Sequence, residues 1–237
     1  MTIPLLPDTD LARIAPLPAD MKLAALKRMR AGFSTFSYKP VRGSFGDIFN
    51  IHPPMFGPSE ATPFAKVKER LERTCKAGDE ITNNLRIAKA LHDYASSAKI
   101  QGRHHEFFPL AISMGRKVTL WLPMVLAIDG QPYAIFIDPR RSNGLSEAGR
   151  RFVFSMMHER IRAADDDFAA VNLGIIRFVD HGDGERSVRL FDAAGIPLYS
   201  IDELQDMVAS TYKMWQEVCE ERVAESRRKG TGTGGLF

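Results

Sequence analysis

The stretch from Trp121 to Arg141, WLPMVLAIDGQPYAIFIDPRR, is the most informative indication of the fold of this chain. Two apolar segments flank the dipeptide Asp129-Gly130, which is one of the strongest short signals for a tight β-hairpin turn. The second segment ends in Asp138-Pro139-Arg140-Arg141. The pattern therefore predicts a hydrophobic hairpin that places a carboxylate and two guanidinium groups at one rim of a sheet. This is a position where an α/β protein could have a catalytic or binding site.

The segments around the hairpin predict a mixed core of helices and strands. Apolar residues at a spacing near two favour strands, and apolar residues every three or four positions favour helices between them. The expected strands are Phe107 to Met114, Val118 to Ile128, Pro132 to Ile137, Ala169 to Val179 and Ser187 to Phe191. The expected helices are one that follows Pro63 and ends at Gly78, and those from Asp79 to Ser97, Ser146 to Ala164 and Ser200 to Arg227. We therefore expect an α/β or α+β domain with a central mixed β-sheet flanked by helices, in which the first three strands form an antiparallel meander.

Three segments of different character divide the chain. Residues 1–64 are rich in proline and aromatic residues and contain one convincing helix, Ala19 to Arg30. Residues 65–227 hold the α/β domain, and residues 228–237 form a glycine-rich tail that we expect to be flexible. The N-terminal segment is predicted to be an extension that packs across the domain or onto a partner.

The composition is that of an ordinary soluble globular protein. Hydrophobic residues make up 44% of the 237 residues, charged residues 26%, and the formal net charge is only +3. This charge is too small to indicate a nucleic-acid partner unless basic residues cluster locally. Cys75 and Cys219 lie far apart, which favours neither a disulfide framework nor a zinc site. The first residues do not show the basic region followed by an apolar region that is typical of a signal sequence. The longest apolar stretch falls short of the roughly 20 residues that span a bilayer, so we expect a cytoplasmic protein without a membrane partner.

From residue 79 to about residue 192, the expected elements follow the order helix, three antiparallel strands, helix, strand, strand. This order resembles the αβββαβ core of the PD-(D/E)XK superfamily, the restriction-endonuclease-like fold. The resemblance implies that an acid on the second strand and an (Asp/Glu)-x-Lys tripeptide on the third hold a divalent metal ion such as Mg²⁺ beside a scissile phosphate. In this sequence it assigns catalysis to Asp129, Asp138 and Arg140, with Asp129 and Asp138 as the metal ligands. It thus implies a nuclease or another metal-dependent phosphodiesterase.

The sequence departs from this family pattern at two positions. Arg140 stands where lysine is expected, and a guanidinium group can bind phosphate but cannot deprotonate to help water attack. Asp129 lies in a predicted tight turn, and the strand from Val118 to Ile128 offers no acid at all. The predicted site is therefore degenerate, and a relative that has the fold without the catalysis is a second interpretation.

Four arginines give a separate reason to expect nucleic-acid binding. Arg140 and Arg141 precede the Ser142-Asn143-Gly144 loop, and Arg150 and Arg151 follow it at the start of a predicted helix. Guanidinium groups and the free N–H groups of a helix start favour phosphate, so DNA or RNA is a predicted partner. The alternative is that these arginines form a solvated face and pair with nearby acids such as Glu147.

A non-enzymatic interaction protein is the competing interpretation. The aromatic segment from Phe33 to Phe56 and the amphipathic last helix could bind another protein or form a homodimer with a second copy of the chain. Leu190-Phe191 and the terminal Leu236-Phe237 also resemble short Leu-Phe motifs that dock on bacterial sliding clamps. We interpret both as chance matches, because the terminal one lacks the usual glutamine and the other lies in an expected strand.

Overall fold

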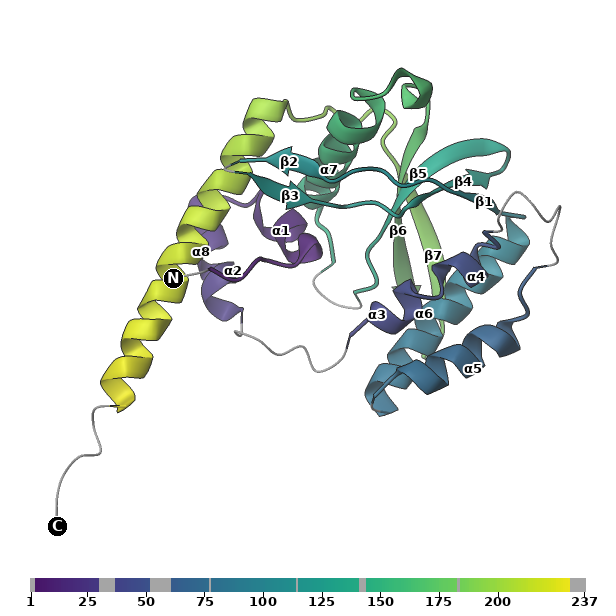
Figure 1. Cartoon of the computed structure of the whole chain (residues 1–237), viewed down its shortest axis with the longest axis horizontal. Coiled ribbons are helices and arrows are strands. Elements are labelled where there is room, and N and C mark those ends of the chain that lie inside the picture. The colour runs from purple at the N-terminus through teal and green to yellow at the C-terminus, as the bar shows by residue number, and fades with distance from the viewer. Residues whose placement is uncertain are drawn as a thin grey trace, which may run out of the picture.

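A computed structural model of the chain describes residues 3–29, 37–51, 61–76, 78–113, 115–140, 144–182 and 184–230, with side chains up to residue 226. Its centre is a five-stranded β-sheet with the strand order β1-β4-β5-β6-β7. Helices cover both faces of this sheet, and a separate two-stranded sheet lies beside the long C-terminal helix (Figure 1). The prediction of an α/β protein with a central mixed sheet is therefore confirmed.

The central sheet is mixed because β5 and β6 run parallel while their neighbours run antiparallel. Its strands are β1 (Gln101–His104), β4 (Met124–Ile128), β5 (Gln131–Ile137), β6 (Asn172–Asp180) and β7 (Arg186–Asp192). A parallel pair needs a crossover connection, which here contains a helix. It consists of α7 (Glu147–Met157), a π-helical turn (His158–Arg162) and a 3₁₀ turn (Asp166–Phe168).

The strands that precede the hairpin differ from the prediction. The outer neighbour of β4 is β1, whereas the predicted strand from Phe107 to Met114 is reduced to β2 (Leu110–Ile112), which pairs with β3 (Arg116–Val118) in a sheet of its own. The predicted strand from Val118 to Ile128 is too long. Leu120 and Trp121 are both buried in the same apolar cluster, whereas consecutive residues of a strand point to opposite faces. The first part of this apolar run is therefore not a strand, and β4 begins only at Met124.

The order of the core elements matches the expected one only when β1, which the sequence did not predict, takes the place of the predicted strand from Phe107 to Met114. When the β2–β3 sheet is set aside, the chain runs from α6 (Gly78–Ser97) through β1, β4, β5 and α7 to β6. This is the αβββαβ order on which the resemblance to the PD-(D/E)XK superfamily rests. The relationship to that superfamily itself stays a prediction.

Two apolar layers enclose the sheet. On one face, α5 (Phe64–Thr74) and α6 pack with the short helices α3 (Lys39–Arg42) and α4 (Phe45–Ile48). On the other face lie α1 (Asp8–Ile14), α2 (Ala19–Arg28), α7 and α8 (Ile201–Gly230). Ile135 and Ile137 of β5 enter the first layer, and Ala134 and Phe136 enter the second. This alternation fixes the register of β5 and leaves Asp138 at its end.

The described part of the N-terminal segment contributes to both layers. Leu11 and Ile14 of α1 are fully buried in the α7–α8 layer, and Phe45 and Phe49 are buried in the α5–α6 layer. Of the aromatic segment from Phe33 to Phe56, only residues 37–51 are described, and they pack within the domain. Helix α1 was not predicted, because it has only seven residues and lies between two prolines.

The last helix, α8, begins with the capping box that its sequence indicates. The Ser200 hydroxyl accepts from the backbone N–H of Glu203 at 3.2 Å, and the Glu203 carboxylate accepts from the backbone N–H of Ser200 at 2.7 Å. Leu204, Val208 and Trp215 are buried, while the last turns extend beyond the body of the protein (Figure 1). Within the described ranges, no helix has the length and apolar character needed to cross a membrane.

Candidate functional site

The two predicted metal ligands lie at opposite ends of one strand. Asp129 lies in the turn between β4 and β5, with a φ of 50°, next to Gly130 with a φ of 76°. Asp138 follows the last residue of β5, and a strand of this length spans roughly 20 Å at about 3.3 Å per residue. Ligands of one Mg²⁺ lie about 2.1 Å from the ion, so these two carboxylates do not fit a shared metal site. In the described part of the chain, no group of three or more His, Cys, Asp or Glu residues could hold a metal ion.

Asp138 is surrounded by hydrogen-bond donors of its own loop. The residue is almost fully buried, with 1% of its surface exposed. One carboxylate oxygen accepts from the backbone N–H of Leu145 at 2.9 Å, and the other accepts from the backbone N–H of Arg140 at 3.3 Å. The Nε atom of Arg177 lies 3.8 Å from the first oxygen. The carboxylate therefore ties together the two ends of the loop between β5 and α7.

Arg140 is held by helix α1. Its guanidinium group lies 2.9 Å from the carboxylate of Asp10 and donates to the Thr9 hydroxyl at 3.0 Å. Asp10 also accepts from Arg13 at 3.0 Å, so one carboxylate binds two guanidinium groups. Burial lowers the pKa of Arg13 and the charge of Arg140 lowers it further, while Asp10 and Asp138 raise it. Sequence reasoning missed Asp10 and Arg13, although an acid three positions before an arginine is a signal of a helical ion pair.

The other arginines that were predicted to bind nucleic acid contact different neighbours. Arg150 lies over the ring of Phe191, with its Cζ atom 4.6 Å from the ring centre, and donates to the carbonyl of Leu145 at 3.4 Å. Arg151 lies 3.7 Å over the ring of Tyr199 and donates to the carbonyl of Leu198 at 3.5 Å. Arg141 lies outside the described residues. The structure therefore does not bring Arg140, Arg150 and Arg151 together into one site.

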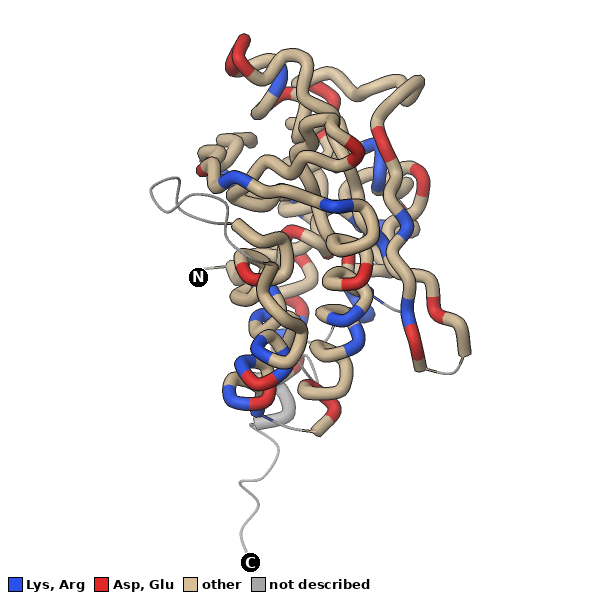
Figure 2. Tube along the Cα trace, turned by 90° about the vertical axis from the view of Figure 1, so that its right-hand side faces the viewer, with Lys and Arg blue, Asp and Glu red and all other residues tan. Residues whose placement is uncertain are grey.

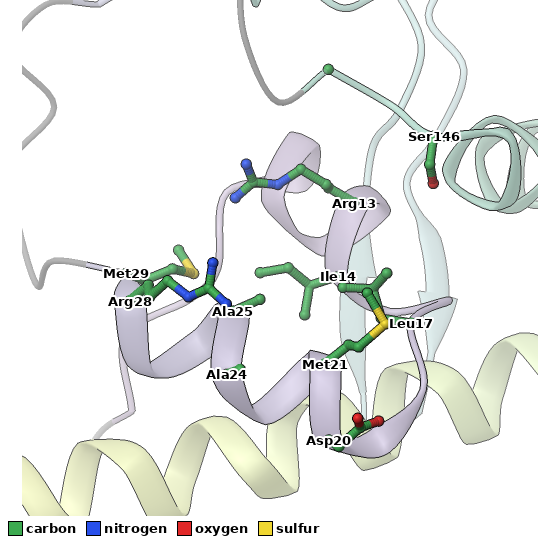
Figure 3. A pocket seen from close by; sticks show the side chains of 11 residues that line it. Arg13, Ile14, Leu17, Asp20, Met21, Ala24, Ala25, Arg28, Met29 and Ser146 are labelled. Carbon is green, nitrogen blue, oxygen red and sulfur yellow. The ribbon is translucent and has the colours of Figure 1, made fainter.

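A mostly apolar cavity of about 630 Å³ lies between α1 and α2, with Gly144 and Ser146 from the loop before α7 in its wall (Figure 3). Its apolar lining consists of Ile14, Leu17, Met21, Ala24, Ala25 and Met29. The guanidinium groups of Arg13 and Arg28 lie toward the Met29 end, whereas Asp20 lies at the other end (Figure 3). Because apolar side chains form most of its lining, the cavity is chemically suited to accept an apolar side chain of a partner protein.

Comparisons with known proteins agree over nearly the whole chain. The sequence model of the family described as sliding clamp-binding bacterial toxin SocB matches residues 9–225. The chain is 34% identical over 227 residues to the DNA replication inhibitor toxin SocB of Caulobacter vibrioides (strain NA1000 / CB15N), and the alignment covers 96% of this chain and 95% of that protein. No solved structure matches the chain. The chain therefore belongs to the SocB family of sliding clamp-binding bacterial toxins.

Proposed function

We propose that this chain is a toxin that inhibits DNA replication in the bacterial cytoplasm by binding the sliding clamp. The observation that carries the proposal is the 34% identity to a replication inhibitor toxin across 96% of the chain. The family match over residues 9–225 includes every strand of the central sheet and most of both helical layers. The similarity thus extends over the whole domain and is not limited to a short motif.

This proposal takes up the interaction protein that the sequence left as an alternative and sets the nuclease aside. The carboxylates of the predicted metal site lie at opposite ends of β5, and Asp138 and Arg140 are used in contacts within the fold. A protein that acts by binding needs a surface that a partner can cover, and it does not need a catalytic constellation. Self-association stays a prediction.

The Leu190-Phe191 pair does not suit docking while it remains in β7. Leu190 packs against the α5–α6 layer, and Phe191 packs against the α7–α8 layer. Two side chains that enter one cleft of a partner must point the same way, whereas consecutive residues of a strand point apart. This geometry favours a chance match. The terminal Leu236-Phe237 lies outside the described residues.

A primer-extension assay with purified components tests the proposed function. One reaction uses a replicative polymerase that depends on the clamp, and the matched control uses a polymerase that works without it. We expect the chain to suppress only the clamp-dependent synthesis, and we expect additional clamp to restore it. Equal inhibition of both polymerases, or degradation of the template when Mg²⁺ is present, would contradict the proposal.

A further inference from the structure

Two arginines lie opposite each other at the edge of the central sheet. Arg177 on β6 and Arg189 on β7 are direct partners in the antiparallel register. Directly opposite residues place their side chains on the same face with Cβ atoms about 5 Å apart, and like charges in this position destabilise a sheet. Arg189 is exposed on the last strand of the sheet, so core packing does not require an arginine there.

A third arginine joins this pair. Arg150 and Arg177 both donate to the carbonyl oxygen of Leu145, at 3.4 and 3.1 Å. Arg150 and Arg189 both lie over the ring of Phe191, with Cζ atoms 4.6 and 4.7 Å from the ring centre. Burial lowers the pKa of Arg150, and the positive charges of Arg177 and Arg189 lower it further, against the opposite effect of Glu147. Arg150, Arg177 and Arg189 therefore form one group, which we call the arginine cluster.

Nearby acids neutralise the arginine cluster only in part. Asp138 lies 3.8 Å from Arg177, but backbone N–H groups already bind both of its oxygens. Glu147 is exposed, so water screens its charge. Among the described residues, Arg189 has no carboxylate within ion-pair distance. The cluster thus retains positive charge that no acid of the chain balances in full.

The chemistry of the arginine cluster fits a phosphate group. Elsewhere along the chain, basic and acidic positions are interspersed (Figure 2), so the cluster does not simply follow from a uniformly basic surface. Guanidinium groups bind phosphate through two parallel N–H donors, and they are the preferred side chains for this ligand. We infer that the arginine cluster contacts the phosphate backbone of DNA. The inference rests on the proposed function, because an inhibitor of replication that binds the clamp works beside DNA.

The geometry also indicates the mode of this contact. Phe191 has arginines over its ring, so it is not free to stack on a base. Contacts to phosphate position a protein on DNA without reading its sequence. The cluster is therefore a sequence-independent contact. Its affinity for DNA falls as salt rises, because binding releases counterions from the DNA and this release is less favourable at high salt.

Fluorescence anisotropy of a labelled DNA duplex of about 20 base pairs, measured with the full chain between about 50 and 200 mM salt, tests the inference. We expect Arg189→Ala to weaken binding about three- to tenfold at the lower salt and to reduce the salt slope by about one, as the loss of one phosphate contact does. Arg189→Lys should restore most of the affinity, because it restores the charge. The control is Arg73→Ala on α5, which removes the same charge from a side chain that is 72% exposed on the opposite layer.

Three outcomes would overturn the inference. They are the absence of DNA binding by the unaltered chain at low salt, an equal loss of affinity in Arg189→Ala and Arg73→Ala, and competition by polyglutamate as effective as that by unlabelled DNA. The last outcome would make the cluster a site for an acidic protein. Clamp binding is measured in parallel with the same variants. If the unaltered chain binds the clamp but not DNA, only this inference fails, and if it binds DNA but not the clamp, the proposed function fails.

Discussion

The carboxylate of Asp138 accepts a hydrogen bond from the backbone N–H of Leu145 at 2.9 Å, across the loop that joins β5 to α7. The acid that the sequence places in a catalytic site thus holds the fold together at the end of the parallel strand pair. It also gives the buried side of Arg177 a negative neighbour, 3.8 Å away. Loss of this carboxylate should therefore act on stability.

We expect Asp138→Ala to lower the free energy of unfolding by about 2 kcal/mol, because it leaves a buried N–H group without an acceptor. Asp138→Asn should cost less, since its amide oxygen can keep one of the two backbone hydrogen bonds. Urea denaturation followed by circular dichroism measures both changes. A variant Asp138→Ala as stable as the unaltered chain would show that the loop does not depend on this carboxylate.

Gly144 makes room for Arg177. A Cβ atom at position 144 would collide with the Nη2 atom of Arg177, whose guanidinium group also donates to the carbonyl of Leu145 at 3.1 Å. We expect Gly144→Ala to lower the free energy of unfolding by about 1 kcal/mol, and we expect the loss to shrink when Arg177→Ala is present, because the two residues are coupled. Gly46→Ala is the matched control, since a Cβ atom there meets nothing within 4 Å. Additive effects of the two changes would refute the steric explanation.

Lys22 is 5% exposed, and its ammonium group donates to the Ser210 hydroxyl at 2.8 Å, where α2 meets α8. Burial lowers the pKa of Lys22. Between this lowered pKa and the value of about 10.4 in the unfolded chain, the unfolded state binds more protons than the folded state, so the contribution of Lys22 to the free energy of unfolding rises with pH. The buried charge lowers the free energy of unfolding by its full amount below the lowered pKa of the folded state. Above the pKa of the unfolded state it has no effect, because the lysine is neutral in both states.

We expect Lys22→Met to raise the free energy of unfolding near neutral pH by about 1 kcal/mol, because it removes a buried charge and keeps an apolar stem. The gain should shrink toward pH 10.4, where the unaltered lysine becomes neutral in both states. Urea denaturation at several pH values measures the difference, with Lys27→Met on the exposed side of α2 as the control. A gain that does not change with pH would contradict this account of Lys22.

We expect Leu190 and Phe191 to contribute to the stability of the fold and not to contact the clamp. Both side chains are partly buried on opposite faces of β7. Replacing either with alanine should lower the free energy of unfolding by about 2 kcal/mol, as truncation of a packed apolar side chain does. Any loss of clamp binding should then follow the unfolded fraction. A folded Leu190→Ala variant that no longer binds the clamp would show that β7 is part of the interface.

The sequence predicts the elements whose periodicity is long and regular. The helix expected from Asp79 to Ser97 is α6, and the Asp129-Gly130 turn has the positive φ values that its residues favour. The apolar run before the hairpin is ambiguous, because burial of Leu120 and Trp121 in one cluster breaks the alternation that identifies a strand. Its true boundary depends on packing with distant residues such as Phe107, whose carbonyl accepts from the Trp121 indole at 3.3 Å.

The candidate site depends even more on tertiary structure. A carboxylate at the end of a strand has the same sequence pattern whether it binds a metal or caps its own loop, and the Leu145 N–H that decides the matter lies seven residues away. Arg177 and Arg189 become neighbours only through the register of β6 and β7. The Asp10 that binds Arg140 belongs to a helix with too few residues to give a periodic signal.

The decisive experiment is binding of the purified chain to a purified bacterial sliding clamp, measured by isothermal titration calorimetry. We expect a saturable complex that Asp138→Asn, if folded, still forms, because this carboxylate stabilises the loop and takes part in no reaction. The absence of heat and of a complex in gel filtration would contradict the claim. So would cleavage of DNA that requires Mg²⁺ and is lost in a folded Asp138→Asn variant.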